Sequence, residues 1–242
     1  MKKRYDPKEA TRYPKTWGKI AGTYRRRDYP LCVTIRGPFW WTRDMLGLKG
    51  AITRIYREPD LINEIVDFCI EFHVEALHKA LGEVEVDYVV LNEDMGYKNG
   101  PMIGPGTARK FLGHAYRELA RFFREHGVKV IVVDSDGNIE PLIPLWLESG
   151  INGITPCEAA ADMDVARLGE RYPDLVLMGG IDKRKLAQDR KDIEREVLYK
   201  VPPLIERKGY FPGVDHAVPP DISLENFRYF ISLLKNLCGW AE

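Results

Sequence analysis

The sequence contains few cysteines, and none of them stands in a paired spacing. Cys32, Cys69, Cys157 and Cys238 are far apart along the chain, with no CxxC motif. This pattern excludes the disulfide framework of a small secreted domain and gives no zinc knuckle. Isolated cysteines of this kind are typical of a reducing compartment, so we expect a cytoplasmic location.

Long apolar runs are also missing. No stretch approaches the roughly 18 consecutive apolar residues of a membrane-spanning helix. The charged N-terminus lacks the apolar segment of a signal peptide. We therefore expect a soluble protein that does not associate with a membrane.

The chain has no net charge, since 36 basic side chains balance 36 acidic ones. A general affinity for nucleic acid is therefore not expected. The charge is unevenly distributed, because residues 1–29 hold ten Lys or Arg against three acidic residues, a net charge of +7. We expect a basic lead-in over residues 1–29 that packs on the acidic remainder of the chain or, alternatively, binds an anionic ligand or partner.

Short apolar runs alternate with helical patterns along the rest of the chain. The clearest run lies within 128–138 (VKVIVVDSDGN) and ends abruptly in polar residues. A short apolar run of this kind predicts a strand buried on both faces, as in a parallel sheet. Its polar end either makes a tight turn by itself or faces a ligand, because function gathers at the carboxyl ends of strands in α/β folds.

This alternation predicts a parallel sheet wrapped by helices. The predicted strands are 31–36, 86–91, 128–133, 151–155, 174–179 and 209–214. The predicted helices are 42–48, 59–82, 107–126, 139–149, 162–171, 190–207 and 222–237, the last with Asp221 or Ser223 as its N-cap. The chain length suits one α/β barrel of about 200–250 residues. We predict an α/β (β/α)8 TIM-barrel domain over residues 30–242, with two of the eight strands missing from the count.

Every predicted strand from the second onward ends in acidic residues or histidine. These residues are Glu93 and Asp94, Asp134 and Asp136, Glu158, Asp182, Asp215 and His216. In a closed barrel they would converge on one point, whereas in an open sheet they would be spread along an edge. The pattern favours the barrel and predicts an active site at its C-terminal face.

Four of these side chains are the candidate catalytic residues: Glu93, Asp94, Asp136 and His216. Adjacent carboxylates raise each other's proton affinity, so one of Glu93 and Asp94 can serve as an acid or base. Asp215 can orient the ring of the neighbouring His216. The structural alternatives are turn capping or pairing with a nearby cation for the carboxylates and a buried, carbonyl-bonded ring for the histidine.

Five further residues are candidates for substrate binding: Asp134, Glu158, Asp182, Tyr97 and Trp40. Asp182 follows two glycines, whose missing side chains let a ligand or backbone approach closely; the alternative is that it caps the next helix. Tyr97 and Trp40 lie in loops at the expected active face, where aromatic rings can cover a ligand or simply pack. Asp134 alternatively anchors the turn.

The polar segments resemble those of the uroporphyrinogen decarboxylase (URO-D) superfamily. The segments that carry the likeness are 92–95 (NEDM), 100–105 (GPMIGP), 133–138 (VDSDGN), 179–182 (GGID), 214–221 (VDHAVPPD) and 225–226 (EN). They stand in the family's order, and the likeness covers about residues 30–237. The resemblance implies a (β/α)8 barrel.

The resemblance also implies one of two chemistries. One is cofactor-free decarboxylation of porphyrinogen acetate groups. The other is methyl transfer to or from a corrinoid, as in the coenzyme M methyltransferases of the superfamily. Both act on a tetrapyrrole, so a tetrapyrrole substrate and, for the second chemistry, a corrinoid co-substrate or corrinoid protein are the expected partners.

The departures from the family pattern concern the N-terminus and the metal site. Family members usually have a longer N-terminal portion, so this chain resembles a shortened member. The corrinoid methyltransferases carry zinc on a His-x-Cys and a late Cys, but the corresponding positions here read Asp134-Ser135-Asp136 and Asp215-His216. Thiolate ligation is thus excluded there. An oxygen-rich divalent metal site including His216 and Asp136 is one alternative.

We conclude from the sequence that the chain is an enzyme of this superfamily, with corrinoid-dependent methyl transfer favoured. Porphyrinogen decarboxylation is the alternative, and a non-catalytic barrel module is a second one. A sheet short of two strands would leave unpaired edges, which proteins normally cover. We therefore also expect a homo-oligomer.

Overall fold

The computed structural model describes residues 5–240. The chain divides into two compact units. The first unit comprises residues 1–93, 102–133 and 142–151, and the second comprises residues 94–101, 134–141 and 152–242. The order of strands in the main sheet is β1-β2-β5-β6-β7-β8.

The strands of the main sheet confirm the α/β class. β1 (Cys32–Arg36) pairs in parallel with β2 (Tyr88–Asn92), and β7 (Val176–Ile181) pairs in parallel with both β6 (Gly153–Thr155) and β8 (Tyr210–Val214). All six predicted strands are present. Within residues 5–240, β1 and β8 each have one neighbouring strand, so hydrogen bonds do not close the sheet into a barrel. Six strands are two fewer than a (β/α)8 barrel contains.

The first unit begins with the basic lead-in. This segment forms a short 3-10 helix (Ala10–Arg12) and α1 (Trp17–Arg25). Its side chains reach acidic partners further along the chain: Lys8 lies 3.7 Å from Glu75, Arg27 lies 2.6 Å from Asp87, and the Trp17 indole N–H donates to Glu83 at 2.6 Å. These contacts agree with the expected packing of the basic segment on acidic residues.

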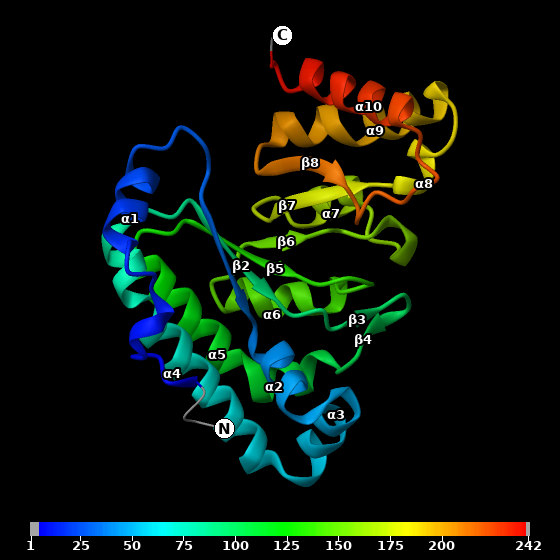
Figure 1. The fold of residues 1–242 in the computed structure, drawn as a ribbon. Helices are drawn as coiled ribbons and strands as arrows, with labels where there is room; N and C mark the ends of the chain where they lie inside the picture. The colour runs from blue at the N-terminus through cyan, green and yellow to red at the C-terminus, as the bar shows by residue number, and fades with distance from the viewer. Residues whose placement is uncertain (1–4, 241–242) are drawn as a thin grey trace. The chain divides into compact units, whose positions relative to one another are not determined.

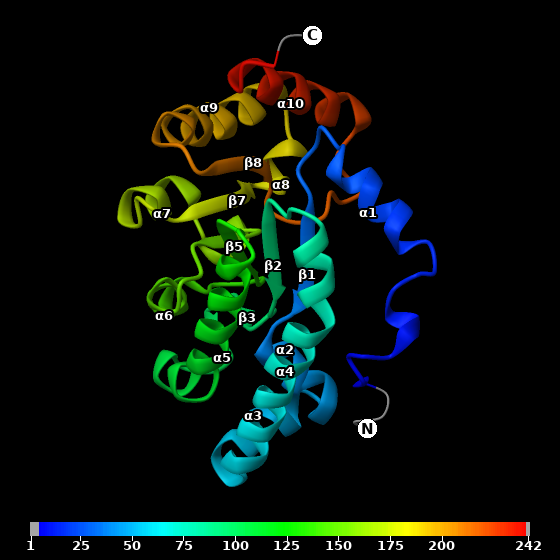
Figure 2. The same cartoon turned by 90° about the vertical axis from the view of Figure 1, so that its left-hand side faces the viewer.

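Two long helices form the core of the first unit, α4 (Pro59–Glu83) and α5 (Pro105–Glu125), which lie side by side (Figure 2). Each starts with a proline at its first position, where the missing N–H has no helical partner to lose. The apolar face of α5 buries Phe111, Leu112, Leu119 and Phe123. The unit also contains β1, β2, α2 (Pro38–Leu46), α3 (Leu48–Arg57), β5 (Val130–Asp134) up to Val133, and α6 (Ile143–Glu148).

The second unit contains a small β3–β4 hairpin (Gly96–Tyr97 and Gly100–Pro101) and three strand–helix steps. Its helices are α7 (Val165–Arg171), α8 (Lys183–Leu186), α9 (Arg190–Arg207) and α10 (Leu224–Leu237), with α9 and α10 side by side (Figure 1). Each begins where a side-chain oxygen accepts a backbone N–H: Asp164, Asp182, Asp189 and Ser223. The predicted cap at Ser223 is therefore confirmed.

The predicted helices differ from the observed ones mainly at short segments. The range 190–207 agrees fully with α9, whereas α1, α3 and the β3–β4 hairpin were not predicted, and α8 was anticipated only as the helix that Asp182 alternatively caps. Segments of this length carry too few apolar positions for a period to stand out. None of the helices formed by residues 5–240 has the length and apolarity needed to cross a membrane.

Candidate active site

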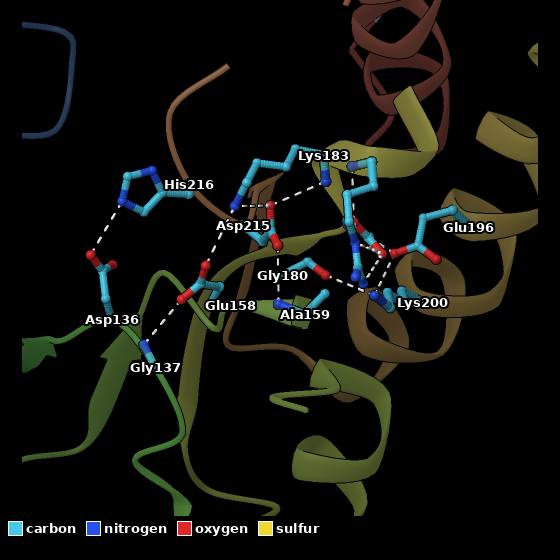
Figure 3. Close-up of polar contacts among 12 residues, drawn as sticks. Asp136, Gly137, Glu158, Ala159, Gly180, Lys183, Glu196, Lys200, Asp215 and His216 are labelled. Atoms are coloured by element: carbon cyan, nitrogen blue, oxygen red, sulfur yellow. Dashed lines mark hydrogen bonds and ion pairs between the residues drawn. The ribbon is translucent and has the colours of Figure 1, made fainter. Parts of the chain in front are cut away.

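The carboxyl ends of β5, β6, β7 and β8 are joined by backbone hydrogen bonds. Ser135 N–H donates to Thr155 O at 3.0 Å, Gly180 N–H to Pro156 O at 2.9 Å, and Asp215 N–H to Ile181 O at 2.9 Å. The polar residues that follow these strands are consequently brought to one edge of the second unit. This edge, with the residues drawn in Figure 3, is the candidate active site.

Asp136 and His216 face each other across this edge. Asp136 Oδ2 lies 3.2 Å from His216 Nε2, and the two side chains are 41% and 43% exposed. Because Asp136 contacts Nε2, we assign the N–H of the neutral ring to Nε2, which leaves the lone pair of Nδ1 to accept a proton that the protonated ring can then donate. The pair thus has the geometry of a carboxylate-oriented histidine open to solvent and substrate.

Asp215, the sequence neighbour of His216, is buried and does not orient the His216 ring in the described contacts. Its side chain is 0% exposed, and its two oxygens accept from the backbone N–H groups of Ala159 (3.0 Å) and Lys183 (3.1 Å). It thereby ties the ends of β6 and β7 to the end of β8. The expected partner of His216 was Asp215, and the structure supplies Asp136 instead.

Glu158 connects the Asp136 turn to a lysine. Its Oε2 accepts the Gly137 N–H at 3.2 Å, and its Oε1 lies 3.6 Å from Lys183 Nζ. Lys183 Nζ also lies 3.5 Å from Asp215 (Figure 3). Lys183 therefore lies between two carboxylates beside the Asp136–His216 pair. Sequence reasoning missed this residue, although its position one residue after a strand-end aspartate was a usable signal.

Asp182 has a structural task in addition to its place at the edge. It caps α8 through the Arg184 N–H and forms a bidentate pair with the Arg184 guanidinium at 2.9 and 2.7 Å. Burial acts to raise the pKa of Asp182, but the hydrogen bonds from Arg184 outweigh it and hold the pKa below its ordinary value. The side chain is thus a stable anion, as the capping alternative anticipated.

A buried lysine, Lys200, binds the backbone at the carboxyl end of β7. Lys200 is 3% exposed and donates to Gly180 O at 2.8 Å and to Glu196, whose other contact is the Asp182 N–H at 2.9 Å. These contacts satisfy the carbonyl and amide groups around the left-handed Gly179-Gly180 pair. The glycines are needed there because a Cβ on Gly180 would lie 2.2 Å from Val165.

The β3–β4 hairpin packs on the turn that carries Asp136. Tyr97 O accepts the Asn138 N–H at 2.8 Å, and Gly137 has a φ of +76° with the backbone of Gly96 and Tyr97 directly beside it. The Tyr97 side chain is 56% exposed. Tyr97 is therefore next to the Asp136 turn in space, as its proposed substrate contact requires.

Asp94 and Asp134 are joined through the backbone. The Asp94 N–H donates to Asp134 O at 3.2 Å, and Asp94 has a φ of +42°. The next residue, Met95, is held by the buried Ser135 hydroxyl at 2.9 Å. The Asp134 contact is made by its backbone carbonyl, so the roles of the Asp134 and Asp94 side chains stay predictions.

Glu93 lies in the first unit and is fully buried. Its Oε2 accepts the N–H groups of Phe39 and Trp40 at the start of α2, both at 2.9 Å, and its Oε1 accepts the Tyr116 hydroxyl at 2.5 Å. Burial raises the pKa of Glu93 to about 7, against the opposing effect of these hydrogen bonds. The described contacts make Glu93 the anchor of α2, and its catalytic role stays a prediction.

Trp40 belongs to the same helix start. The Arg43 and Arg36 guanidinium groups lie over its ring, at 4.0 and 5.4 Å from the ring centre. Its indole nitrogen is buried and has no hydrogen-bond partner among residues 5–240. Cation–π contacts of this kind fix the ring, and substrate contact by Trp40 stays a prediction.

The donor set at the strand ends does not fit a metal ion well. Within residues 5–240 no three His, Cys, Asp or Glu side chains are grouped so as to hold a metal. Asp136 and His216 supply two donors, and the next acidic residues, Glu158 and Asp215, are already engaged with backbone N–H groups. Cys157 adds no thiolate, because burial raises its pKa to about 12.

The candidate active site carries more acidic than basic side chains. Its carboxylates are Asp136, Glu158, Asp182, Glu196 and Asp215, and its permanent cations are Lys183, Arg184 and Lys200. Each of these cations has a carboxylate partner. The edge is therefore better suited to a neutral or cationic substrate group than to a polyanion.

Comparisons with known proteins now place the chain in a family. The family model described as uroporphyrinogen decarboxylase (URO-D) matches residues 3–237. The chain therefore belongs to the URO-D family, as its motifs indicated.

The individual relatives agree with this assignment. A uroporphyrinogen decarboxylase from Hydrogenobaculum sp. (strain Y04AAS1) is 29% identical over 68 residues, which are 28% of this chain and 20% of that protein. A solved structure of a methyltransferase from Methanosarcina mazei is 16% identical, with a TM-score of 0.65, over 91% of this chain and 64% of that one. This chain thus spans less than two thirds of either relative, and the second likeness establishes the fold alone.

Proposed function

We propose that this URO-D family protein catalyses methyl transfer to a corrinoid, with Asp136 and His216 as its proton-transfer pair. The observation that carries the proposal is the 3.2 Å contact between Asp136 Oδ2 and His216 Nε2, two side chains about two-fifths exposed at the strand ends. A pair of this kind suits general acid–base catalysis. Decarboxylation needs such a proton donor, and so does methyl transfer from a donor whose leaving atom departs as an anion.

The charge of the site favours methyl transfer over decarboxylation. A porphyrinogen carries several carboxylates, and its binding would require cations that are not already neutralised. Lys183, Arg184 and Lys200 are each paired with carboxylates at this edge. A neutral or cationic methyl donor meets no such repulsion.

The proton pair has a defined task in this reaction. The electron pair of reduced cobalt forms the new bond to the methyl carbon, while the bond from that carbon to its oxygen or nitrogen breaks and its electrons stay on the leaving atom. His216 Nδ1 donates a proton to that atom when the atom leaves as an anion. Asp136 stabilises the protonated ring before the transfer and keeps its orientation.

The test is formation of methylcobalamin from reduced cobalamin and a panel of N-, O- and S-methyl donors, followed by absorbance. We expect His216→Gln and Asp136→Asn to lower the rate with an oxygen donor about 10²- to 10⁴-fold. His114→Gln is the matched control, because His114 Nε2 pairs with Asp67 at 2.9 Å on the first unit. It should leave the rate unchanged.

The same samples separate the alternatives. Consumption of uroporphyrinogen or coproporphyrinogen with release of CO2, and no methylcobalamin, would replace methyl transfer by decarboxylation. Absence of both reactions, with no binding of cobalamin in equilibrium dialysis, would favour the non-catalytic module.

A further inference from the structure

An apolar groove lies between β8 and α10, and its lining includes neither Asp215 nor His216, the polar residues that follow β8. It has a volume of about 510 Å³, within the range of about 300–1,000 Å³ typical of small-molecule sites. Its apolar lining includes Phe211, Pro212, Ile231, Leu234, Cys238 and Trp240. We call it the β8–α10 groove.

Two aromatic side chains of the groove are largely exposed. Phe211 is 52% exposed and Trp240 is 70% exposed. Single exposed apolar residues are normal, but two large rings beside a continuous apolar lining form a patch that is typical of a binding site. The surface therefore has the composition to take an apolar chain.

The edge of β8 disfavours an added strand as the occupant. Leu177 N–H donates to Gly209 O and Asp215 N–H to Ile181 O, so odd-numbered β8 residues bond to β7. By alternation the nitrogen of Pro212 is on the outer side, where proline has no N–H to offer. A proline at this point of an edge blocks continuous strand pairing. The groove is thus better suited to a small ligand than to an extended peptide.

The groove has a charge that selects among small ligands. Lys208 and Lys235 are the charged residues in its lining, which includes no Asp or Glu. Within residues 5–240, neither ammonium group makes an ion pair. Lys208 is fixed at the α9–β8 turn, with a φ of +71°. An apolar trough with two unpaired cations complements a molecule with an apolar chain and one anionic head.

We propose that the β8–α10 groove binds a free single-chain carboxylate amphiphile, of the fatty-acid class. The chain lies on Phe211, Ile231, Leu234 and Trp240, and the carboxylate is held by Lys208 and Lys235. The site is independent of the proposed methyl transfer, because it uses none of the residues assigned to that reaction.

The test is calorimetric titration of the whole chain with octanoate, decanoate and dodecanoate below their micelle concentrations. We expect saturable 1:1 binding that tightens roughly fourfold for each added methylene. Decanol and decyltrimethylammonium, with the same chain but a neutral or cationic head, should bind more weakly than decanoate. Emission from the exposed Trp240 should change on binding, and Trp240→Phe should remove that change.

Variants connect the binding to the groove. Lys208→Gln with Lys235→Gln should weaken decanoate binding about tenfold and leave decanol binding unchanged. Phe211→Ser, at an exposed position, should weaken both ligands. Lys191→Gln on α9, an exposed lysine outside the groove, is the matched control and should change neither.

Four results would overturn the proposal. Equal affinity for all three head groups would show detergent-like adsorption only. The same conclusion would follow if the double lysine variant bound decanoate as tightly as wild type does. Binding to phosphatidylcholine–phosphatidylserine vesicles without binding of decanoate would assign the groove to a membrane surface. A dimer in sedimentation that dissociates in Phe211→Ser, together with no decanoate binding, would assign it to a second copy of this chain.

Discussion

Asp136 and His216 are eighty residues apart in the chain, yet their carboxylate and imidazole groups meet at 3.2 Å. The contact depends on the ends of β5 and β8 being held by the backbone links through β6 and β7. Because both side chains are about two-fifths exposed, the pair contributes little to stability and is available for chemistry. The residues beneath it, by contrast, are buried and hold the strand ends in place.

Because Asp136 is partly exposed and Asp215 is buried, we predict that substituting them has different effects on stability. Asp215→Ala leaves the N–H groups of Ala159 and Lys183 without their acceptor, and we expect it to lower the free energy of unfolding by about 2–5 kcal/mol. Asp136→Ala should lower it by less than about 1 kcal/mol. Urea unfolding followed by circular dichroism measures both. Equal losses would show that Asp215 does not have the supporting role assigned to it.

Glu93 predicts a pH dependence of stability. Its pKa is raised to about 7 in the folded protein by burial, from 4.5. Between these values the folded state binds more protons than the unfolded state, so the free energy of unfolding should fall as pH rises from about 4.5 to about 7, by about 3 kcal/mol in total. Above that range the contribution of Glu93 is constant.

The measurement is urea unfolding of wild type and Glu93→Gln at several pH values. The glutamine cannot titrate, so its stability relative to wild type should increase across this window, whatever its absolute value. The groups around the carboxyl, Tyr116 and Arg43, are unchanged in the variant. Glu125→Gln, at an exposed helix position, should follow the wild-type profile. A Glu93→Gln profile parallel to wild type would contradict the raised pKa.

The sequence was sufficient for the class of fold because the signals for strands are local. All six parallel strands appear as apolar runs bounded by turn residues, and the acidic residues at their ends follow from the alternation of strand and helix. The closure of the barrel could not be decided in this way, since it depends on pairing between strands that are distant in the chain. The short α3 and the β3–β4 hairpin left no periodic pattern.

The partners of the site residues were harder to predict than the residues themselves. Asp215 is adjacent to His216 in sequence, but successive residues at a strand end point in opposite directions. Asp215 is consequently buried and His216 is exposed, and the partner of His216 comes from another strand. Similarly, the sequence does not show that Glu93 faces the start of α2, because that contact joins residues about fifty positions apart.

Gly137 predicts a specific sensitivity of the turn that carries Asp136. Its φ is +76°, and an added Cβ would lie 2.7 Å from backbone atoms of Gly96 and Tyr97. Gly137→Ala should therefore displace the β3–β4 hairpin and lower the free energy of unfolding by about 2–4 kcal/mol. Gly47 has a φ of +70° and a ψ of 159° with open space around it, so Gly47→Ala should show backbone strain alone, about 1–3 kcal/mol.

Thermal or urea unfolding measures the free energy of unfolding of the two glycine variants. The second measurement is the rate of methyl transfer at a temperature where both variants are folded. Activity should be lost in Gly137→Ala and kept in Gly47→Ala, because only the first moves the Asp136 turn. Equal activity in both would mean that the position of this turn does not matter for the reaction.

The choice between proton transfer and metal-assisted chemistry at the Asp136–His216 pair is open to a direct measurement. Two side-chain donors, with Glu158 and Asp215 already bonded to backbone N–H groups, are fewer than the three protein ligands that a catalytic zinc site uses. Elemental analysis of protein purified without chelators should therefore give the same metal content for wild type, His216→Ala and Asp136→Ala. About one equivalent of a transition metal in wild type, lost in both variants, would instead assign the pair to a metal site. Its histidine would then be a ligand whose lone pair is occupied, and the proton donor would have to be sought among its neighbours, with Lys183 the first to test.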